Sequence, residues 1–110
     1  MKDALHKLNK AFENRSRLGI MSLLMVDDRV DFLTLKQSLD LSDGNLASHL
    51  ASLEKQEYIA VHKSFVGRKP HTEYEATKAG KQAFSEHLDA LEAFLRQMDS
   101  PKDSPDSSPS

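Results

Sequence analysis

A helix start at Ser42 constrains the fold of this chain more than any other single feature. Ser42 is a strong N-cap residue, and Leu41 before it and Leu46 after it have the spacing of a hydrophobic staple. A second helix is expected just upstream, over Leu35–Leu39, with Thr34 as its N-cap. The sequence therefore predicts two helices joined by a turn of only a few residues.

A β-hairpin with a basic tip is expected to follow this helix pair. Tyr58–Val66 alternates in part between apolar and polar residues and predicts a strand, and Thr72–Ala76 predicts the returning strand. Between them, Gly67–His71 contains Gly and Pro and predicts a loop of about four to six residues. A helix pair followed by such a hairpin is typical of a helix-turn-helix with a wing. No acidic residue lies between Glu57 and Glu73, and the basic side chains of this interval include Lys63, Arg68, Lys69 and His71.

Amphipathic segments flank this central part of the chain. Lys2–Phe12 and Arg15–Met25 are each predicted to form a helix, the second with Asn14 as its N-cap. A short extended piece is expected at Val30–Phe32, and a long last helix is expected to run from about Thr77 to Met98. The apolar residues of the two terminal helices recur at spacings of three and four; they include Leu5, Leu8 and Phe12, and Phe84, Leu88, Leu91 and Leu95.

Length and composition limit the possible classes of protein. A chain of 110 residues supports one domain with a single core, and the absence of Cys excludes disulfides, thiolate zinc sites and Cys nucleophiles. We find no apolar run of membrane-spanning length and no signal-peptide pattern, so a cytoplasmic protein is expected. The stretch over residues 99–110 has no apolar residue and predicts a disordered tail after a domain over residues 1–98.

The net charge of −2 would by itself argue against a nucleic-acid partner. The predicted tail, however, carries three Asp and one Lys, and these account for the whole negative charge. The predicted domain is therefore neutral, and its hairpin tip is a local concentration of positive charge. The net charge consequently does not exclude DNA as a partner.

The polar face of the helix that begins at Ser42 has the chemistry needed to read base edges. Asn pairs with adenine through two hydrogen bonds, Ser serves several bases, and His either donates or accepts. Asp43 is the unfavourable residue, because a carboxylate repels phosphate unless it caps the helix or accepts from a cytosine amine. A helix face that simply faces water would show the same residues, so this face alone leaves both interpretations open. The candidate base-reading residues are Asn45, Ser48, His49 and Ser52, and weaker candidates for phosphate contacts are Thr34, Lys36 and Arg15.

Several segments together resemble the small winged-helix transcriptional regulators of the MarR/ArsR-like group, over about residues 8–95. The resemblance implies an α+β, mostly α, fold: a winged helix-turn-helix with a β-hairpin wing and with N- and C-terminal dimerisation helices. It further implies a sequence-specific, repressor-like homodimer on a palindromic operator in double-stranded DNA. Arg68 and Lys69 match the basic pair of the wing tip, and His71 stands where the pattern often has Arg. The segments that carry the resemblance are Arg17–Leu24, Leu41–Leu50, Leu53–Ile59, Phe65–Tyr74 and Thr77–Gly80.

The resemblance also assigns the dimer interface to the apolar residues of the two terminal helices named above. Packing inside one chain would produce the same spacing, and a pattern sustained for about two heptads does not prove pairing between chains. Both interpretations of these apolar residues therefore stay open.

Three other classes of protein have weaker support in the sequence. An enzyme is not expected, because the chain has neither a nucleophile elbow nor a Gly-rich phosphate loop. No cofactor is expected either. A metal- or ligand-responsive sensor of the same fold is an alternative, but the last helix offers only His87 with Glu86, Asp89 and Glu92, so no metal site is assigned and the effector is unknown. A winged-helix protein-interaction module is the other alternative, and it would show an acidic or apolar face in place of the neutral polar one.

Overall fold

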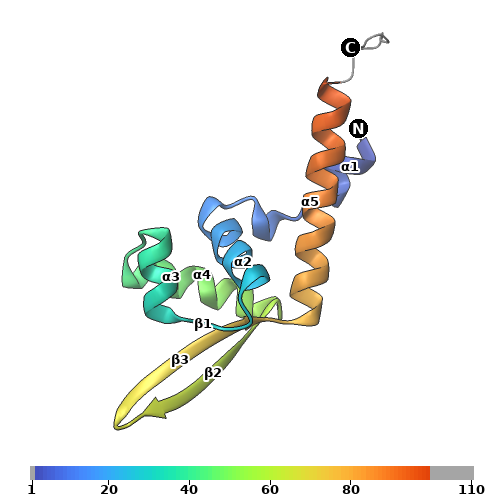
Figure 1. The fold of residues 1–110 in the computed structure, drawn as a ribbon. Helices are drawn as coiled ribbons and strands as arrows, with labels where there is room; N and C mark the ends of the chain where they lie inside the picture. Colours follow the sequence, from blue (N-terminus) through green and yellow to red (C-terminus); the bar gives the residue numbers. More distant parts are fainter. Residues whose placement is uncertain (1, 100–110) are drawn as a thin grey trace.

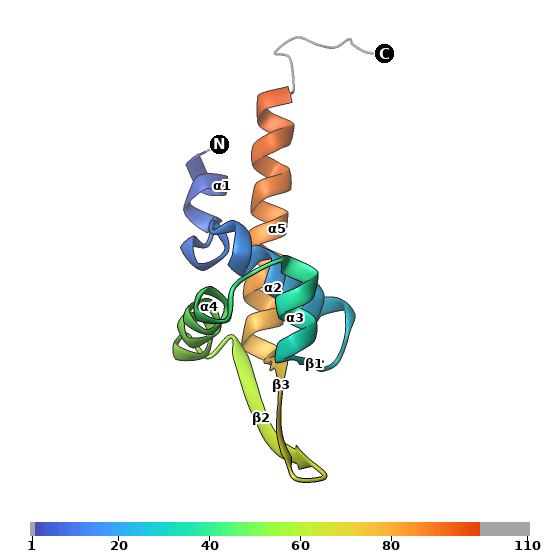
Figure 2. The ribbon, with the colours of Figure 1, turned by 90° about the vertical axis from the view of Figure 1, so that its left-hand side faces the viewer.

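The computed structural model describes residues 2–99 and has the mostly helical α+β winged-helix fold that the sequence predicts (Figure 1). A helical body lies in the middle of the molecule, the β-hairpin projects from one end, and the last helix projects from the other (Figures 1 and 2). The elements are α1 (Lys2–Lys7), a short 3-10 helix η1 (Lys10–Phe12), α2 (Arg15–Val26), β1 (Val30–Asp31), α3 (Phe32–Leu39), α4 (Asp43–Lys55), β2 (Ile59–Val66), β3 (Lys69–Ala76) and α5 (Lys78–Asp99).

The three strands form one antiparallel sheet in the order β1-β3-β2, and β2, β3 and the turn between them form the wing. The wing turn is shorter than the sequence predicts. Cross-strand pairing continues to Val66 and Lys69, so only Gly67 and Arg68 remain between the strands, and the expected loop of four to six residues is wrong. Gly67 has a φ of +65°, which glycine adopts without steric cost and which tight two-residue hairpin turns require.

Local caps determine where three of the helices begin. Asn14 accepts from two backbone N–H groups at the start of α2, and Ser42 Oγ accepts from Asn45 N at 3.1 Å, so both predicted N-caps are confirmed. The prediction for α3 is wrong, because Asp31 is its cap and accepts from Thr34 N at 2.8 Å. The helix consequently begins at Phe32, and the extended piece ends one residue earlier.

The single helix predicted over Lys2–Phe12 is broken after Lys7. Asn9 causes this break, because its side chain accepts from Ala11 N at 2.9 Å and caps η1. Its backbone N–H donates to His87 Nδ1 at 2.9 Å, and its Nδ2 donates to the Tyr58 hydroxyl at 2.9 Å. The N-terminal segment is thus fixed to the body by polar contacts over long sequence distances, and no spacing rule predicts them.

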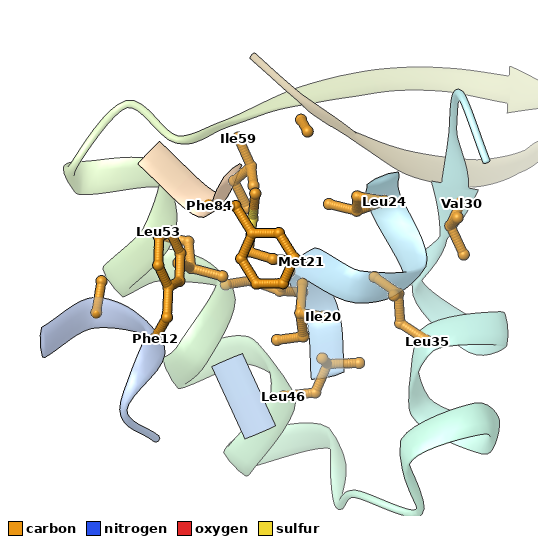
Figure 3. Packing of buried hydrophobic residues seen from close by; sticks show 13 residues of the cluster. Phe12, Ile20, Met21, Leu24, Val30, Leu35, Leu46, Leu53, Ile59 and Phe84 are labelled. Carbon is orange, nitrogen blue, oxygen red and sulfur yellow. The ribbon is translucent and has the colours of Figure 1, made fainter. Parts of the chain in front are cut away.

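The core lies between α2, α3, α4, the base of the wing and the first turns of α5 (Figure 3). Phe12 and Phe84 belong to it, with exposed fractions of 1% and 3% and ring centroids 5.2 Å apart in an edge-on arrangement. The prediction that these two residues contact a second chain is therefore wrong, because they pack inside one chain. The most deeply buried side chains are Phe12, Ile20, Met21, Leu24, Leu35, Leu46 and Leu53.

Helix α5 is buried near its start and carries exposed apolar residues further along. Phe84, His87 and Ala90 are buried, and α1 packs beside α5 (Figure 2). The exposed apolar face consists of Leu88, Leu91, Leu95 and Met98, while Leu5 of α1 is exposed as well and Leu8 is half-buried.

The helix continues to Asp99, one residue beyond the predicted domain boundary, and the rest of the predicted tail lies outside the described residues. Among the helices of residues 2–99, none is both long and apolar enough to cross a membrane.

Candidate nucleic-acid interface

Helix α4, the candidate recognition helix, presents an uncharged polar face. Leu46, Leu50 and Leu53 are buried and attach the helix to the core. Asn45 and Ser48 are exposed at a spacing of three residues, so they lie on one face. Of the two remaining candidates, Ser52 and His49 are half-buried.

His49 is held by a residue that the sequence analysis did not single out. Arg17 Nη1 lies 3.3 Å from His49 Nδ1, and Arg17 Nε donates to the Ala11 carbonyl at 2.7 Å. Burial, and then the charge of Arg17, lower the pKa of His49 below its ordinary value. Because a guanidinium can only donate, Nδ1 of His49 is the acceptor and the proton lies on Nε2. His49 therefore offers a hydrogen-bond donor, and not an acceptor, to a partner outside the chain.

Asp43, the residue that the sequence analysis found unfavourable for DNA, is paired in the structure. Lys36 Nζ lies 2.8 Å from its carboxylate, so the charge next to the start of α4 is balanced. Both side chains are exposed, and such surface pairs are weak enough to exchange one partner for a phosphate. Lys36 therefore neutralises the charge of Asp43, and Lys36 can contact DNA only when this ion pair opens.

The tip of the wing carries cations without partners inside the described chain. Lys63, Arg68 and Lys69 are exposed, and none of them forms an ion pair within residues 2–99. The hairpin that carries them projects from the body (Figure 2). These three side chains are consequently free to contact an anionic partner.

The base of the wing has mixed charge, which the acid-free interval of the sequence conceals. His71 lies 3.2 Å from Glu73, and His62 lies 2.8 Å from Glu75 across the sheet. Arg29 lies 3.7 Å from Glu73 and 3.9 Å from Glu75. Antiparallel pairing brings the acidic residues of β3 beside His62 of β2. The cations of the wing that have no acidic partner among the described residues are Lys63, Arg68 and Lys69. His71 lies opposite Ser64, nearer the turn than Lys63, but unlike the three exposed cations it has an acidic partner, Glu73.

Of the weaker phosphate-contact candidates, Lys36 adjoins the start of α4 through its contact with Asp43, and the other two are positioned differently. Thr34 is exposed in the first turn of α3. Arg15, at the start of α2, lines a hollow of about 590 Å³ together with Ser38 and Asp40, and no residue of α4 or of the wing lines it. Residues 2–99 contain no group of three or more His, Asp or Glu side chains placed to hold a metal ion.

Two exposed apolar residues at the wing tip, Phe65 and Val66, are not among the candidates that the sequence suggested. Adjacent apolar residues in a strand point to opposite faces, so in a two-stranded projection at least one of them faces water. That break in the alternation is the signal by which they could have been found.

Comparison with known proteins places the chain in a family. The family model for winged helix DNA-binding domains matches residues 16–95, so the chain belongs to this family. The resemblance to winged-helix transcriptional regulators is thereby confirmed.

Three similar proteins extend this finding. Uncharacterized protein MJ0432 of Methanocaldococcus jannaschii is 33% identical over 79 residues, which is 72% of this chain and 86% of that protein. The solved structure of a transcriptional regulator homologue from Pyrococcus horikoshii superimposes with a TM-score of 0.82 at 30% identity, covering 90% of this chain and 99% of that one. The transcriptional repressor CouR, solved with a 23-mer DNA duplex, shares the fold with a TM-score of 0.68 at 17% identity, over 88% of this chain and 70% of that one.

Proposed function

We propose that this protein is a sequence-specific, repressor-like transcriptional regulator that binds double-stranded DNA in the cytoplasm as a homodimer. The observation that carries the proposal is an uncharged polar face on α4 combined with cations on a projecting wing that form no ion pair among the described residues. The major groove of DNA is wide enough to admit one helix, and a basic hairpin suits the adjacent phosphates.

In this proposal the two regions have different tasks. Asn45, Ser48, His49 and Ser52 read base edges, and His49 contributes a donor from Nε2 that suits guanine N7 or O6. At the wing, Lys63, Arg68 and Lys69 contact the flanking phosphates, while Thr34, Lys36, Arg15 and His71 add weaker positioning contacts.

The homodimer is supported by the exposed apolar face of α5. Leu88, Leu91, Leu95 and Met98 lie on the helix that projects from the body, and Leu5 of α1 is exposed as well (Figure 1). Packing this face against a second copy of the chain would remove its apolar side chains from water. A dimer with twofold symmetry binds two equivalent half-sites, so the operator is expected to be palindromic.

Selection of bound sites from a pool of random duplexes tests this proposal directly. The expected result is an enriched palindrome with its half-sites one helical turn, or a multiple of it, apart. A pool that shows no enrichment would contradict sequence-specific binding. An enriched site without symmetry would contradict the dimer and leave DNA binding standing.

A further inference from the structure

The wing tip holds two large apolar side chains beside its cations. Phe65 is 71% exposed and Val66 is 63% exposed, although both lie in the last two positions of β2. Phe65 pairs across the sheet with Pro70, and Val66 pairs with Lys69. Since successive residues of a strand point to opposite faces, Phe65 and Pro70 share one face of the hairpin and Val66 points to the other.

The face that carries Phe65 is apolar at its centre and basic beside it. A hollow of about 310 Å³ beside the tip is lined by Lys63, Ser64, Phe65, Pro70, His71 and Thr72, of which Phe65 and Pro70 are the apolar members. Lys63 lies two residues before Phe65 and therefore on the same face, while Arg68 is in the turn itself. The apolar surface consequently lies between two cations that have no ion-pair partner within the described chain.

We propose that Phe65, packed on Pro70, is a DNA contact: its ring lies against the deoxyribose groups along the edge of the minor groove, while Lys63 and Arg68 contact the phosphates on either side. This inference rests on the proposed DNA-binding function. A sugar–phosphate strand alternates apolar deoxyribose with anionic phosphate, and the wing face shows the complementary order of apolar ring and cations. A protein partner suits this face less well, because an apolar surface of about two residues is far smaller than a stable protein interface requires.

The position of the ring also favours the sugars over insertion between base pairs. Gly67 and Arg68 form the apex of the hairpin, and Phe65 lies on its side, two residues before Gly67. A minor groove about 6 Å wide admits the apex with its arginine. The ring on the side of the hairpin would then meet the wall of the groove, which deoxyribose forms.

Salt dependence separates the apolar contribution from the ionic one. Each phosphate contact by a cation makes the affinity fall with salt concentration, since counterions are released on binding. Burial of an apolar ring releases no counterion, so its contribution is the same at every salt concentration. Substitutions of Phe65 and of the tip cations should therefore change the plot of log Kd against log salt concentration in different ways.

The experiment measures the Kd of the full chain for its selected duplex across a series of potassium chloride concentrations. We expect Phe65→Ala to weaken binding about tenfold at every salt concentration, without changing the salt slope. This loss is on the scale of the free energy gained by burying one phenyl ring. Phe65→Leu should keep most of the affinity. The matched control, Val66→Ala, is nearly as exposed but on the other face, and it should change the Kd less than about twofold.

Two outcomes would overturn the inference: a Phe65→Ala protein that binds as tightly as the unchanged protein, or one whose loss appears only as a shallower salt slope. If the unchanged protein binds no duplex at all, the proposed function fails, which is a different result from a normal Kd for Phe65→Ala.

Photo-cross-linking tests the same contact without relying on a Kd, which a loss of folding stability could also change. A photo-reactive benzoylphenylalanine at position 65 should cross-link to the DNA flanking each half-site, and the same group at position 66 should cross-link less. Cross-linking from position 65 to protein alone would contradict the proposal.

Discussion

The recognition helix and the wing hold their functional side chains in different ways. In α4, His49 is fixed by Arg17, Asp43 is paired with Lys36, and buried leucines attach the helix to the core. At the wing tip, Arg68 lies in the two-residue turn, Lys69 is the first residue of β3, and neither forms an ion pair within residues 2–99.

This difference separates two kinds of contribution to DNA binding. Polar groups held in one orientation discriminate between bases, because a wrong base leaves them without a partner. Cations that are free to move contribute affinity for any sequence, since phosphates are the same everywhere. Substitutions in α4 should therefore change specificity, and substitutions at the tip should change affinity and its salt dependence.

The largest effect is expected at Gly80, where the wing joins the helical body. A Cβ at this position would overlap the carbonyl of Tyr58, the residue just before β2, whose oxygen accepts from Thr77 N at 3.0 Å. Gly80→Ala should lower the free energy of unfolding by about 3 kcal/mol in urea denaturation, since the backbone must move. The control is Gly44→Ala in α4, where nothing lies within 4 Å of the added carbon. Equal stability of the two variants would show that this contact does not fix the base of the wing.

Disrupting the dimer should weaken the DNA contacts of the recognition helix and of the wing together. Leu88→Asp combined with Leu91→Asp places two charges on the exposed apolar face of α5 without touching the core. Light scattering at micromolar concentration should change from the dimer mass to the monomer mass, and DNA affinity should fall about a hundredfold as bivalent binding is lost. Gln97→Asp, an exposed polar position of the same helix, is the control and should remain dimeric. An unchanged protein that is already a monomer would contradict the dimer.

A smaller effect, confined to one position of the operator, is expected from Asn45. Asn45→Ala should cost ~1–3 kcal/mol of discrimination at one base pair and leave the salt slope unchanged. The measurement is a Kd for each single-base-pair variant of the selected site. Arg68→Ala with Lys69→Ala is the comparison: it should weaken all sites alike and flatten the slope by up to about two units for each bound wing. If Asn45→Ala also weakens all sites alike, this residue does not read a base.

The sequence predicted the parts of the fold that local chemistry determines. Ser42 and Asn14 cap their helices through backbone groups only two or three residues away, and a single chain segment contains everything that such a cap requires. The prediction failed at two caps that are equally local, Asp31 and Asn9, and it gave no sign of contacts between distant residues. Asn9 donates to His87 Nδ1 and to the Tyr58 hydroxyl, far along the chain, and these contacts fix the interrupted segment to the body.

The same limit applies to the candidate site. The sequence identified the cations of the tip, but strand register places Glu73 opposite His62 and brings Glu75 within 2.8 Å of it, so the base of the wing is not basic. The apolar spacing in α5 similarly could not show which residues face inward, because His87 and Ala90 also take part in the buried face. Polar and small residues in a core carry no periodic signal that separates them from a solvent-exposed face.

The smallest expected effect is a loss of stability in mild acid that arises in the helical body. Burial lowers the pKa of His87 below its ordinary value of 6.5, and the negative charge of Glu13 opposes this shift only in part. The folded chain therefore favours the neutral ring more than the unfolded chain does. The contribution of His87 to the free energy of unfolding is full above about pH 6.5, and it is lost as the pH falls from there through the folded pKa. Protonation also removes the acceptor that Nδ1 offers to the Asn9 N–H.

His87→Gln tests this cause, because an amide oxygen can still accept a hydrogen bond and does not titrate. Urea denaturation at pH 7.5 and at pH 5.5 should show a smaller difference for this variant than for the unchanged protein. His49→Gln should reduce the difference less, since His49 is half-buried and His87 is only 4% exposed, although the pKa of both is lowered by burial. An identical difference in all three proteins would show that acid acts on the fold through other groups. A larger reduction for His87→Gln than for His49→Gln would instead place the acid-sensitive contact between Asn9 and α5, away from both the recognition helix and the wing.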